Sequence, residues 1–410
     1  MLALRRRAAL IGVYVFYAVL LNSVGTVILQ SILSFGVSKP QGSILEACKD
    51  LSIAAVSFAT ASFLSRIGYR PAVVFALAMV SLACLAMPLV PGFATAEVLF
   101  LAIGVSFALV KVSVYSLIGV LERDPRGHAG LTSLIEGCFM VGVLSGVWIF
   151  SLFIDNRNPA SLAWLNVYWG LGGAGLLLAG LWLLTPMSER SVGEAVRHGA
   201  LIDDLRRIPA LFISPFLVAF LTSIFLYVLI EQSLGTWLPT YNREILGLPV
   251  SMSVQAGGFL AGGLAIGRLA GAVILRRLSW APVLLACVAG AAGVILLALA
   301  LQPAHPFAVS DWRSAPFQAF VLPLAGLFLA PIYPALNSAI LSALPERSQA
   351  PMTGLIIAFS ALGGTFGSFL TGQFFAHFGG RNAFGLALTA LLLLAGALIW
   401  LRRKMPAAAG

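Results

Sequence analysis

Charged side chains are scarce in this chain: Asp, Glu, Lys and Arg make up 10% of its 410 residues, whereas 60% are hydrophobic. In soluble globular proteins about a quarter of the residues are charged. Because so few charges cannot cover an apolar core with a water-facing surface, the composition predicts an integral membrane protein. The apolar stretches are continuous and do not alternate with polar residues, so we expect membrane-spanning helices and not barrel strands.

Sequence patterns for disulfide, metal and nucleotide chemistry are also missing. The cysteines are isolated and the histidines lack metal-ligand spacing, so neither set indicates a metal site. A membrane-embedded enzyme would need a cluster of histidine, acidic or metal-binding residues at membrane depth, and a primary pump would need an ATP motif. The sequence therefore predicts a protein that is not an enzyme and uses no metal or other cofactor. The residues concerned are Cys48, Cys84, Cys138, Cys287, His128, His198, His305 and His377.

The net charge of +10 follows membrane topology and does not indicate a nucleic-acid partner, because no basic stripe with interleaved aromatic residues is present. Counted alternately from the N-terminus, the loops of one side hold seventeen of the 25 Lys and Arg residues, and those of the other side hold five. Cytoplasmic loops carry the basic excess, so we predict a multi-pass protein of a bacterial-type inner membrane with both termini cytoplasmic. The remaining Lys49, Lys111 and Arg268 fall within apolar stretches, where a charge is costly and marks a function or an internal pair.

Twelve apolar stretches are each long enough to cross a bilayer as a helix. The polar segment 186–209, predicted to be a cytoplasmic linker, separates two predicted six-helix bundles, 1–185 and 210–410, in a protein that we expect to be an all-α monomer. The predicted spans are 8–35, 43–65, 71–90, 96–121, 131–154, 161–185, 210–236, 252–275, 281–301, 317–343, 352–376 and 384–401.

The fifth and eleventh stretches are related in sequence at a constant offset of 221 residues. Thr132 and Thr353, Gly142 and Gly363, and Gly146 and Gly367 coincide at that offset. A parallel duplication of six helices, or 6+6 repeat, is typical of one large class of transporters.

The loop after the second stretch carries a recognisable motif, Arg66-Ile-Gly68-Tyr-Arg70. At this place the major facilitator superfamily has Gly, three residues, Asp, a basic residue, any residue, Gly and further basic residues. The chain resembles this superfamily in that loop and in its whole 6+6 layout, although Ala61 and Ser65 replace the Gly and the Asp. The resemblance implies gating roles for Arg66 and Arg70.

Within the superfamily, three further features are most similar to the fucose permease group of proton-coupled sugar symporters. They are Ile67-Gly-Tyr-Arg70, the Asn22…Gln30 pair and Pro331-Ile-Tyr-Pro334. Those symporters carry acidic residues in their first and fourth helices, where this chain has Gly25 and approximately Lys111. Their coupling chemistry therefore does not carry over to this chain.

In the superfamily, spans one, four, seven and ten line a central cavity, which implies a substrate site here. Asn22, Thr26 and Gln30 recur every four residues, so they are expected to share one helix face. Lone polar residues on membrane helices also serve as hydrogen-bonding contacts between helices, which is the alternative for each of them. The expected substrate-binding residues are Asn22, Thr26, Gln30, Lys111, Tyr115, Tyr227, Gln232, Tyr333 and Asn337.

Lys111 allows two interpretations. It pairs with Glu136 on the next span and holds the bundle, or its ammonium binds an anionic group of the substrate and competes for Glu136. Glu231, Asp50 and Glu136 are the candidate proton carriers, because burial favours the protonated form of a carboxyl group.

Lys49 and Asp50 form either an outer-gate ion pair or a proton site, whereas Glu46 is expected near water. Arg268 is expected to be an inner-gate residue, so the gating set is Lys49, Arg66, Arg70 and Arg268. The superfamily resemblance implies that span five packs on span eight, and we expect glycines to form a sliding seam there. These glycines are Gly142, Gly146, Gly258, Gly262, Gly263, Gly267, Gly271, Gly363 and Gly367.

Taken together, these features predict a secondary active transporter that works by alternating access in the lipid bilayer. Its partners would be a small polar, anionic or sugar-like solute and protons, in symport. The alternative is an exporter of a metabolite, siderophore or drug by proton antiport.

Overall fold

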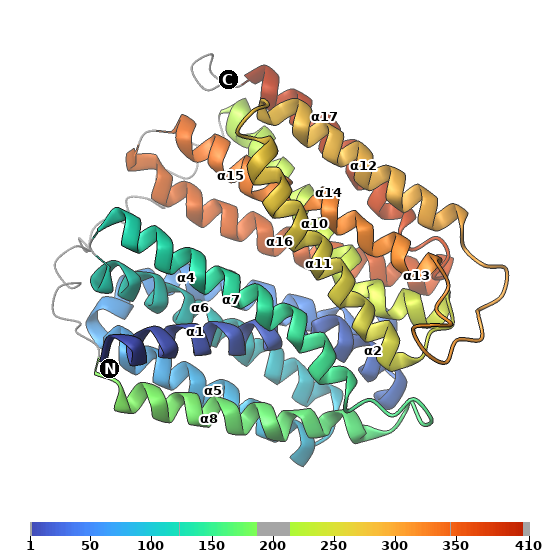
Figure 1. Ribbon diagram of the computed structural model, residues 1–410, viewed down its shortest axis with the longest axis horizontal. Helices are drawn as coiled ribbons and strands as arrows, with labels where there is room; N and C mark the ends of the chain where they lie inside the picture. Colours follow the sequence, from blue (N-terminus) through green and yellow to red (C-terminus); the bar gives the residue numbers. More distant parts are fainter. Residues whose placement is uncertain (1, 123, 187–213, 345, 405–410) are drawn as a thin grey trace. The chain divides into compact units, whose positions relative to one another are not determined.

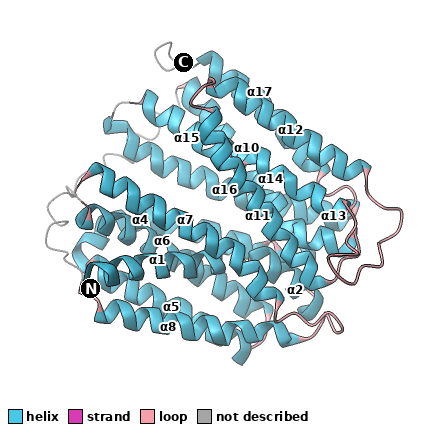
Figure 2. Cartoon of the chain, in the orientation of Figure 1, coloured by secondary structure: helices cyan, strands magenta, loops and turns pink. Residues whose placement is uncertain are grey.

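The computed structural model describes residues 2–122, 124–186, 214–344 and 346–404, and these residues form helices and loops without a strand (Figures 1 and 2). The chain divides into two units, Met1–Gly36 with Leu45–Asp203 and Val37–Ile44 with Asp204–Gly410. The predicted linker lies outside the described residues except for Pro186.

The helices of the first unit follow one another through short connections. They are α1 (Leu2–Leu21), α2 (Val24–Phe35), α4 (Ile44–Ile67), α5 (Tyr69–Leu89), α6 (Phe93–Leu121), α7 (Pro125–Ser151), the 3-10 helix η1 (Leu162–Asn166) and α8 (Val167–Leu184).

The second unit contains one short helix from the N-terminal part of the chain and the helices of the C-terminal half. They are α3 (Lys39–Gly42), α10 (Pro215–Glu244), α11 (Val250–Ile274), α12 (Trp280–Ala300), α13 (Gln318–Val321), the 3-10 helix η2 (Leu322–Leu324), α14 (Ala325–Leu329), α15 (Ile332–Ala343), α16 (Glu346–Phe378) and α17 (Gly385–Lys404).

Hydropathy locates the spans well. In the described part of the chain, 11 helical segments are long and apolar enough to cross a membrane, and each overlaps a predicted span. The remaining predicted span, 43–65, is occupied by the 24-residue helix α4. Its first turns carry Glu46, Lys49 and Asp50, which lower its apolar character.

Two predicted spans are broken and not continuous. The first is interrupted by a turn at Asn22 and Ser23, whose side chains donate hydrogen bonds to the carbonyls of Ala18 (2.8 Å) and Leu20 (2.7 Å). The tenth consists of the short helices α13 to α15, with prolines at Pro323 and Pro331. A proline has no N–H for a helical hydrogen bond and interrupts the helix.

Glycines allow two equivalent close helix crossings, one in each unit. A Cβ atom on Gly142 of α7 would lie 2.8 Å from the carbonyl oxygen of Val15 on α1, and one on Gly363 of α16 would lie 2.4 Å from that of Phe225 on α10. One turn further on, Gly146 and Gly367 face Val19 and Leu229. The glycines that match at the offset of 221 thus make the same kind of contact, which supports the internal duplication.

The predicted sliding seam between spans five and eight is wrong for the glycines whose neighbours are known. Gly142, Gly146, Gly363 and Gly367 face α1 or α10, as described above. On α11, Gly263 and Gly267 approach the backbone between Pro323 and Leu327, and Gly271 approaches Pro331. All of these contacts lie within one unit, because the absent side chains let helices of the same unit touch. Gly262 faces open space.

The connection between α2 and α4 is held on the second unit. Ser38 and Gln41 form a capping box on α3. The ammonium of Lys39 lies 2.9 Å from the Glu244 carboxylate and 5.6 Å from the centre of the Phe375 ring. An ion pair and a cation–π contact therefore attach α3 to α10 and α16.

The close contact at Gly367 can be tested by adding one methyl group, in the substitution of this glycine by alanine. Gly367→Ala should lower the free energy of unfolding by about 1–3 kcal/mol, because its Cβ would lie 2.3 Å from the Leu229 carbonyl oxygen. Gly262→Ala adds the same group in open space, and its better helix propensity should leave stability unchanged or raised. Denaturation of the two variants in detergent measures both effects. Equal stabilities would contradict the close crossing.

Candidate functional site

One face of α6 carries a lysine between two aromatic residues. Phe107, Lys111 and Tyr115 follow at intervals of four residues, so they lie on the same side of the helix. The Lys111 side chain is exposed, Tyr115 is half-buried, and Phe107 is buried. A cation is thus presented from a largely apolar helix surface.

The carboxylate of Glu136 on α7 contacts Tyr115 of the same cluster. The Tyr115 hydroxyl donates a hydrogen bond of 2.5 Å to Oε1 of Glu136. Glu136 is exposed and close enough to act electrostatically on Lys111. Within the described residues, however, no carboxylate lies within the 4.0 Å of Lys111 that defines an ion pair. The structural ion pair considered for Lys111 and Glu136 is therefore not formed, since Tyr115 holds the carboxylate.

Aromatic rings from three helices pack beside these two charges. Tyr14 on α1 contacts Phe107, Tyr115 and Phe139, with ring centroids 6.2, 6.3 and 5.9 Å apart. Phe107 and Phe139 also lie 6.4 Å apart. The helix positions that bear Lys111 and Glu136 are therefore fixed by a packed aromatic cluster of α1, α6 and α7. Sequence patterns do not indicate Tyr14 or Phe139, because aromatic residues in apolar helices carry no signal of their partners on other helices.

The second group of charges is buried near the start of α4. Glu46, Lys49 and Asp50 are only 0%, 5% and 8% exposed. The Lys49 ammonium contacts Oε1 of Glu46 and lies 3.5 Å from Oδ1 of Asp50. The expectation that Glu46 lies near water is wrong, because Lys49 draws both carboxylates into the helix packing. Lys49 and Asp50 form the predicted ion pair, and Glu46 extends it to a triad.

The backbone of α6 approaches α4 closely at the triad. A Cβ on Gly104 would lie within 3 Å of the Lys49 carbonyl and of Ser52 Cβ, so only glycine lets the two helices meet here. The buried triad thus lies on a part of α4 that is in close contact with α6.

The third group of charges lies in the second unit. The carboxyl of Glu231 on α10 interacts with the hydroxyl of Tyr227 one turn earlier and with the Arg268 guanidinium of α11. The rings of Tyr227 and Tyr333 on α15 lie 5.7 Å apart, and the Tyr333 hydroxyl is 3.3 Å from Ser360 on α16. This arrangement brings together Tyr227, Glu231, Arg268 and Tyr333 from the predicted set.

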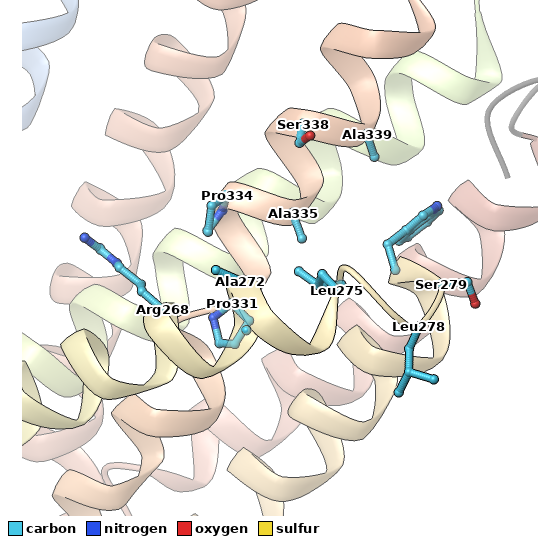
Figure 3. A pocket seen from close by; sticks show the side chains of 12 residues that line it. Arg268, Ala272, Leu275, Leu278, Ser279, Pro331, Pro334, Ala335, Ser338 and Ala339 are labelled. Atoms are coloured by element: carbon cyan, nitrogen blue, oxygen red, sulfur yellow. The ribbon is translucent and has the colours of Figure 1, made fainter. Parts of the chain in front are cut away.

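A cavity of about 510 Å³ adjoins this third group (Figure 3). Arg268 and Ala272 of α11 line it together with Pro331, Pro334 and Ser338 of the tenth span. In Figure 3 the side chain of Arg268 extends from α11 at the end away from Ser279. Arg268 thus lines the cavity and also acts electrostatically on the Glu231 carboxyl.

The remaining predicted residues take different positions. Asn22 is exposed at the turn between α1 and α2, whereas Thr26 and Gln30 are buried on α2. Gln232 and Asn337 are half-buried. The Asn337 amide oxygen has no hydrogen-bond partner in the parts of the chain that the structure describes.

The two loop arginines also differ. Arg70 donates hydrogen bonds to the backbone carbonyls of Trp182 (3.1 Å) and Leu183, at the end of α8. It therefore caps a helix C-terminus, where a cation is favourable. Arg66 lies in the last turn of α4, and its side chain is outside the described part of the structure.

The described helices include segments long and apolar enough to cross a membrane, and charged and polar side chains lie inside several of them. The sequence profile of the Major Facilitator Superfamily matches residues 10–312. The chain therefore belongs to this superfamily, as its sequence features predicted. No curated protein matches the sequence.

Several solved transporters share the fold. A bacterial homologue of the human lysosomal transporter Spinster, in an inward-facing and occupied conformation, is 15% identical with a TM-score of 0.75, over 97% of this chain and 96% of that one. The nucleoside transporter NupG is 15% identical with a TM-score of 0.72, over 98% and 99%. The fucose transporter FucP in its outward conformation is 15% identical with a TM-score of 0.63, over 99% and 100%. At these identities the similarity shows the fold alone.

The buried triad leads to a stability prediction. Lys49→Met should lower the free energy of unfolding by about 3–5 kcal/mol, because two carboxylates would remain buried without their cation. Arg7→Met is the matched control: it removes an ion pair to Glu122 whose arginine is 53% exposed, and it should cost about 0–1 kcal/mol. Denaturation in detergent compares them, and similar losses would show that the triad carries no special weight.

Proposed function

We propose that this protein transports a small polar solute across a bacterial-type inner membrane by alternating access, in symport with protons. The observation that carries the proposal is the exposed Lys111 ammonium inside a membrane helix, without an ion pair in the described residues. Retaining a charge there is costly unless a ligand or pathway uses it. An anionic group of the solute is the complementary partner.

The proposed topology has twelve spans in two six-helix bundles, 1–185 and 210–410, with both termini and the linker 186–209 in the cytoplasm and a monomer as the working unit. The sorting of basic residues between loops supports this orientation. The two glycine crossings at α1/α7 and α10/α16 support equivalent bundles, since the helices concerned occupy the same places in the two halves.

The three candidate proton carriers differ in their surroundings. Asp50 is held by Lys49 in a buried ion pair. Because the ammonium stabilises the ionised carboxylate, this pair is better suited to a gating role than to proton transfer. Glu231 is half-buried and interacts with Tyr227 and with Arg268, which lines the cavity. A carboxyl between a tyrosine and a long, flexible arginine side chain can exchange one partner for a proton. We therefore assign proton coupling to Glu231, and Glu136 is the alternative carrier.

Other solved structures with this fold are consistent with such coupling. One is the D-xylose–proton symporter, 14% identical with a TM-score of 0.73 over 98% of both chains. Its name concerns that protein, and the proton coupling of the present chain rests on its own acidic residues.

Substitution of Lys111 tests the proposal. A thermal-shift screen of sugars, nucleosides, carboxylates and amino acids first identifies a solute, whose uptake into proteoliposomes is then measured. Lys111→Met should lower uptake by about 10- to 100-fold, because a hydrogen-bonded charge contact to the solute is lost.

Lys404→Met removes the same type of side chain from an exposed position at the end of α17 and should transport normally. Normal uptake by Lys111→Met, with both variants folded, would refute the proposed site. Solute movement only out of the cytoplasmic compartment would identify the exporter instead.

A further inference from the structure

The charges of Lys111 and Glu136 are opposite in sign, near each other and yet not paired. Glu136 acts electrostatically on Lys111, but Tyr115 donates the hydrogen bond that the carboxylate accepts. Both charged side chains are exposed within the span region of α6 and α7. The structure therefore keeps a cation and an anion available at one place.

The remaining hydrogen-bonding capacity of the two groups defines what they can bind. A lysine ammonium has three donors, and a carboxylate has about four acceptor positions, of which Tyr115 uses one. Lys111 can thus hold a carboxylate of a ligand, and the free acceptor positions of Glu136 can hold an ammonium or hydroxyl group.

Charge balance favours one kind of ligand. A monoanion would contact Lys111 and leave Glu136 without a cation in direct contact, and a neutral sugar would give neither group an oppositely charged contact. In a medium of low polarity an uncompensated charge is expensive, so a ligand with one charge of each sign is the best complement. Such a ligand also adds no net charge to the site.

The surroundings specify the uncharged part of the ligand. Phe139 and Tyr115 are half-buried near the two charges, and their rings contact the buried ring of Tyr14. Aromatic faces pack well against apolar and aromatic groups. The site therefore offers an apolar surface next to a separated ion pair.

We infer that the solute is a zwitterion of the amino-acid class with an apolar or aromatic side chain, whose carboxylate binds Lys111 and whose ammonium binds Glu136. This inference rests on the proposed transport function and specifies its substrate. Because the solute ammonium occupies Glu136, the proton of the cycle is left to Glu231.

A set of matched ligands tests the inference on the purified full-length protein. L-phenylalanine has both charges, 3-phenylpropionate lacks the ammonium, 2-phenylethylamine lacks the carboxylate, and L-fucose has neither charge. Binding is measured by calorimetry or tryptophan fluorescence. L-phenylalanine should bind at least 10-fold more tightly than each of the other three, because each lacks one or both charge contacts.

Two variants assign the contacts to their residues. In Lys111→Met, L-phenylalanine and 2-phenylethylamine should bind alike, because the carboxylate has lost its partner. In Glu136→Gln, L-phenylalanine and 3-phenylpropionate should bind alike for the corresponding reason. Thermal melting of both variants verifies that they are folded. The ligand series on the wild-type protein tests the inference independently of these variants.

The outcomes separate this inference from the proposed function. Binding of L-fucose or 3-phenylpropionate with equal or higher affinity than L-phenylalanine, or no binding of L-phenylalanine, overturns the zwitterion. If another solute is then transported with the expected dependence on Lys111, the transport proposal stands and only the substrate class fails. If transport of every solute is independent of Lys111, the proposed site fails as well.

Discussion

The cost of placing a charge inside a membrane helix governs the arrangement of this protein. Three basic residues lie in the spans, and each is treated differently. Lys49 is enclosed by Glu46 and Asp50, and Arg268 acts on Glu231 beside a cavity. Lys111 has no carboxylate in ion-pair distance among the described residues. The acidic neighbours of Lys49 and Arg268 explain structurally why those charges are tolerated. Lys111 has no such explanation, so it is the residue to which we assign a function.

Close helix contacts provide the frame that holds these groups. Within the first unit, Gly142 allows α7 to touch α1, and the rings of Tyr14 and Phe139 meet across the same pair of helices. Gly363 and Gly367 do the same for α16 and α10, the helix that carries Tyr227 and Glu231. In each unit, therefore, the glycine crossing fixes a helix that bears part of the candidate site. Tyrosine completes both sites: Tyr115 holds Glu136, and Tyr227 holds Glu231.

The sequence was sufficient to predict the spans and the family, because hydropathy over some twenty residues is a strong signal. It was not sufficient for the breaks in two spans. A single Asn-Ser pair interrupts the first one, between α1 and α2. The glycine positions were found from the repeat, but their partners were assigned to the wrong helices. A glycine in a membrane helix indicates a close contact with another helix, and it does not identify that helix.

The contacts of the candidate site illustrate the same limit. Lys111 and Glu136 stand out in the sequence as charges within apolar spans, and their spacing left a direct ion pair open. In the structure Glu136 accepts a hydrogen bond from Tyr115 and does not pair with Lys111. This contact depends on side-chain directions, which residue spacing along two separate helices does not determine.

The central claim is that solute and proton use different carboxyl groups, with the proton on Glu231. Proteoliposomes that contain a pH-sensitive dye test it directly when solute is added outside without an imposed gradient. The wild-type lumen should acidify as solute enters. Glu231→Gln should still exchange labelled for unlabelled solute but produce no acidification. Acidification of wild-type size in Glu231→Gln would contradict the claim.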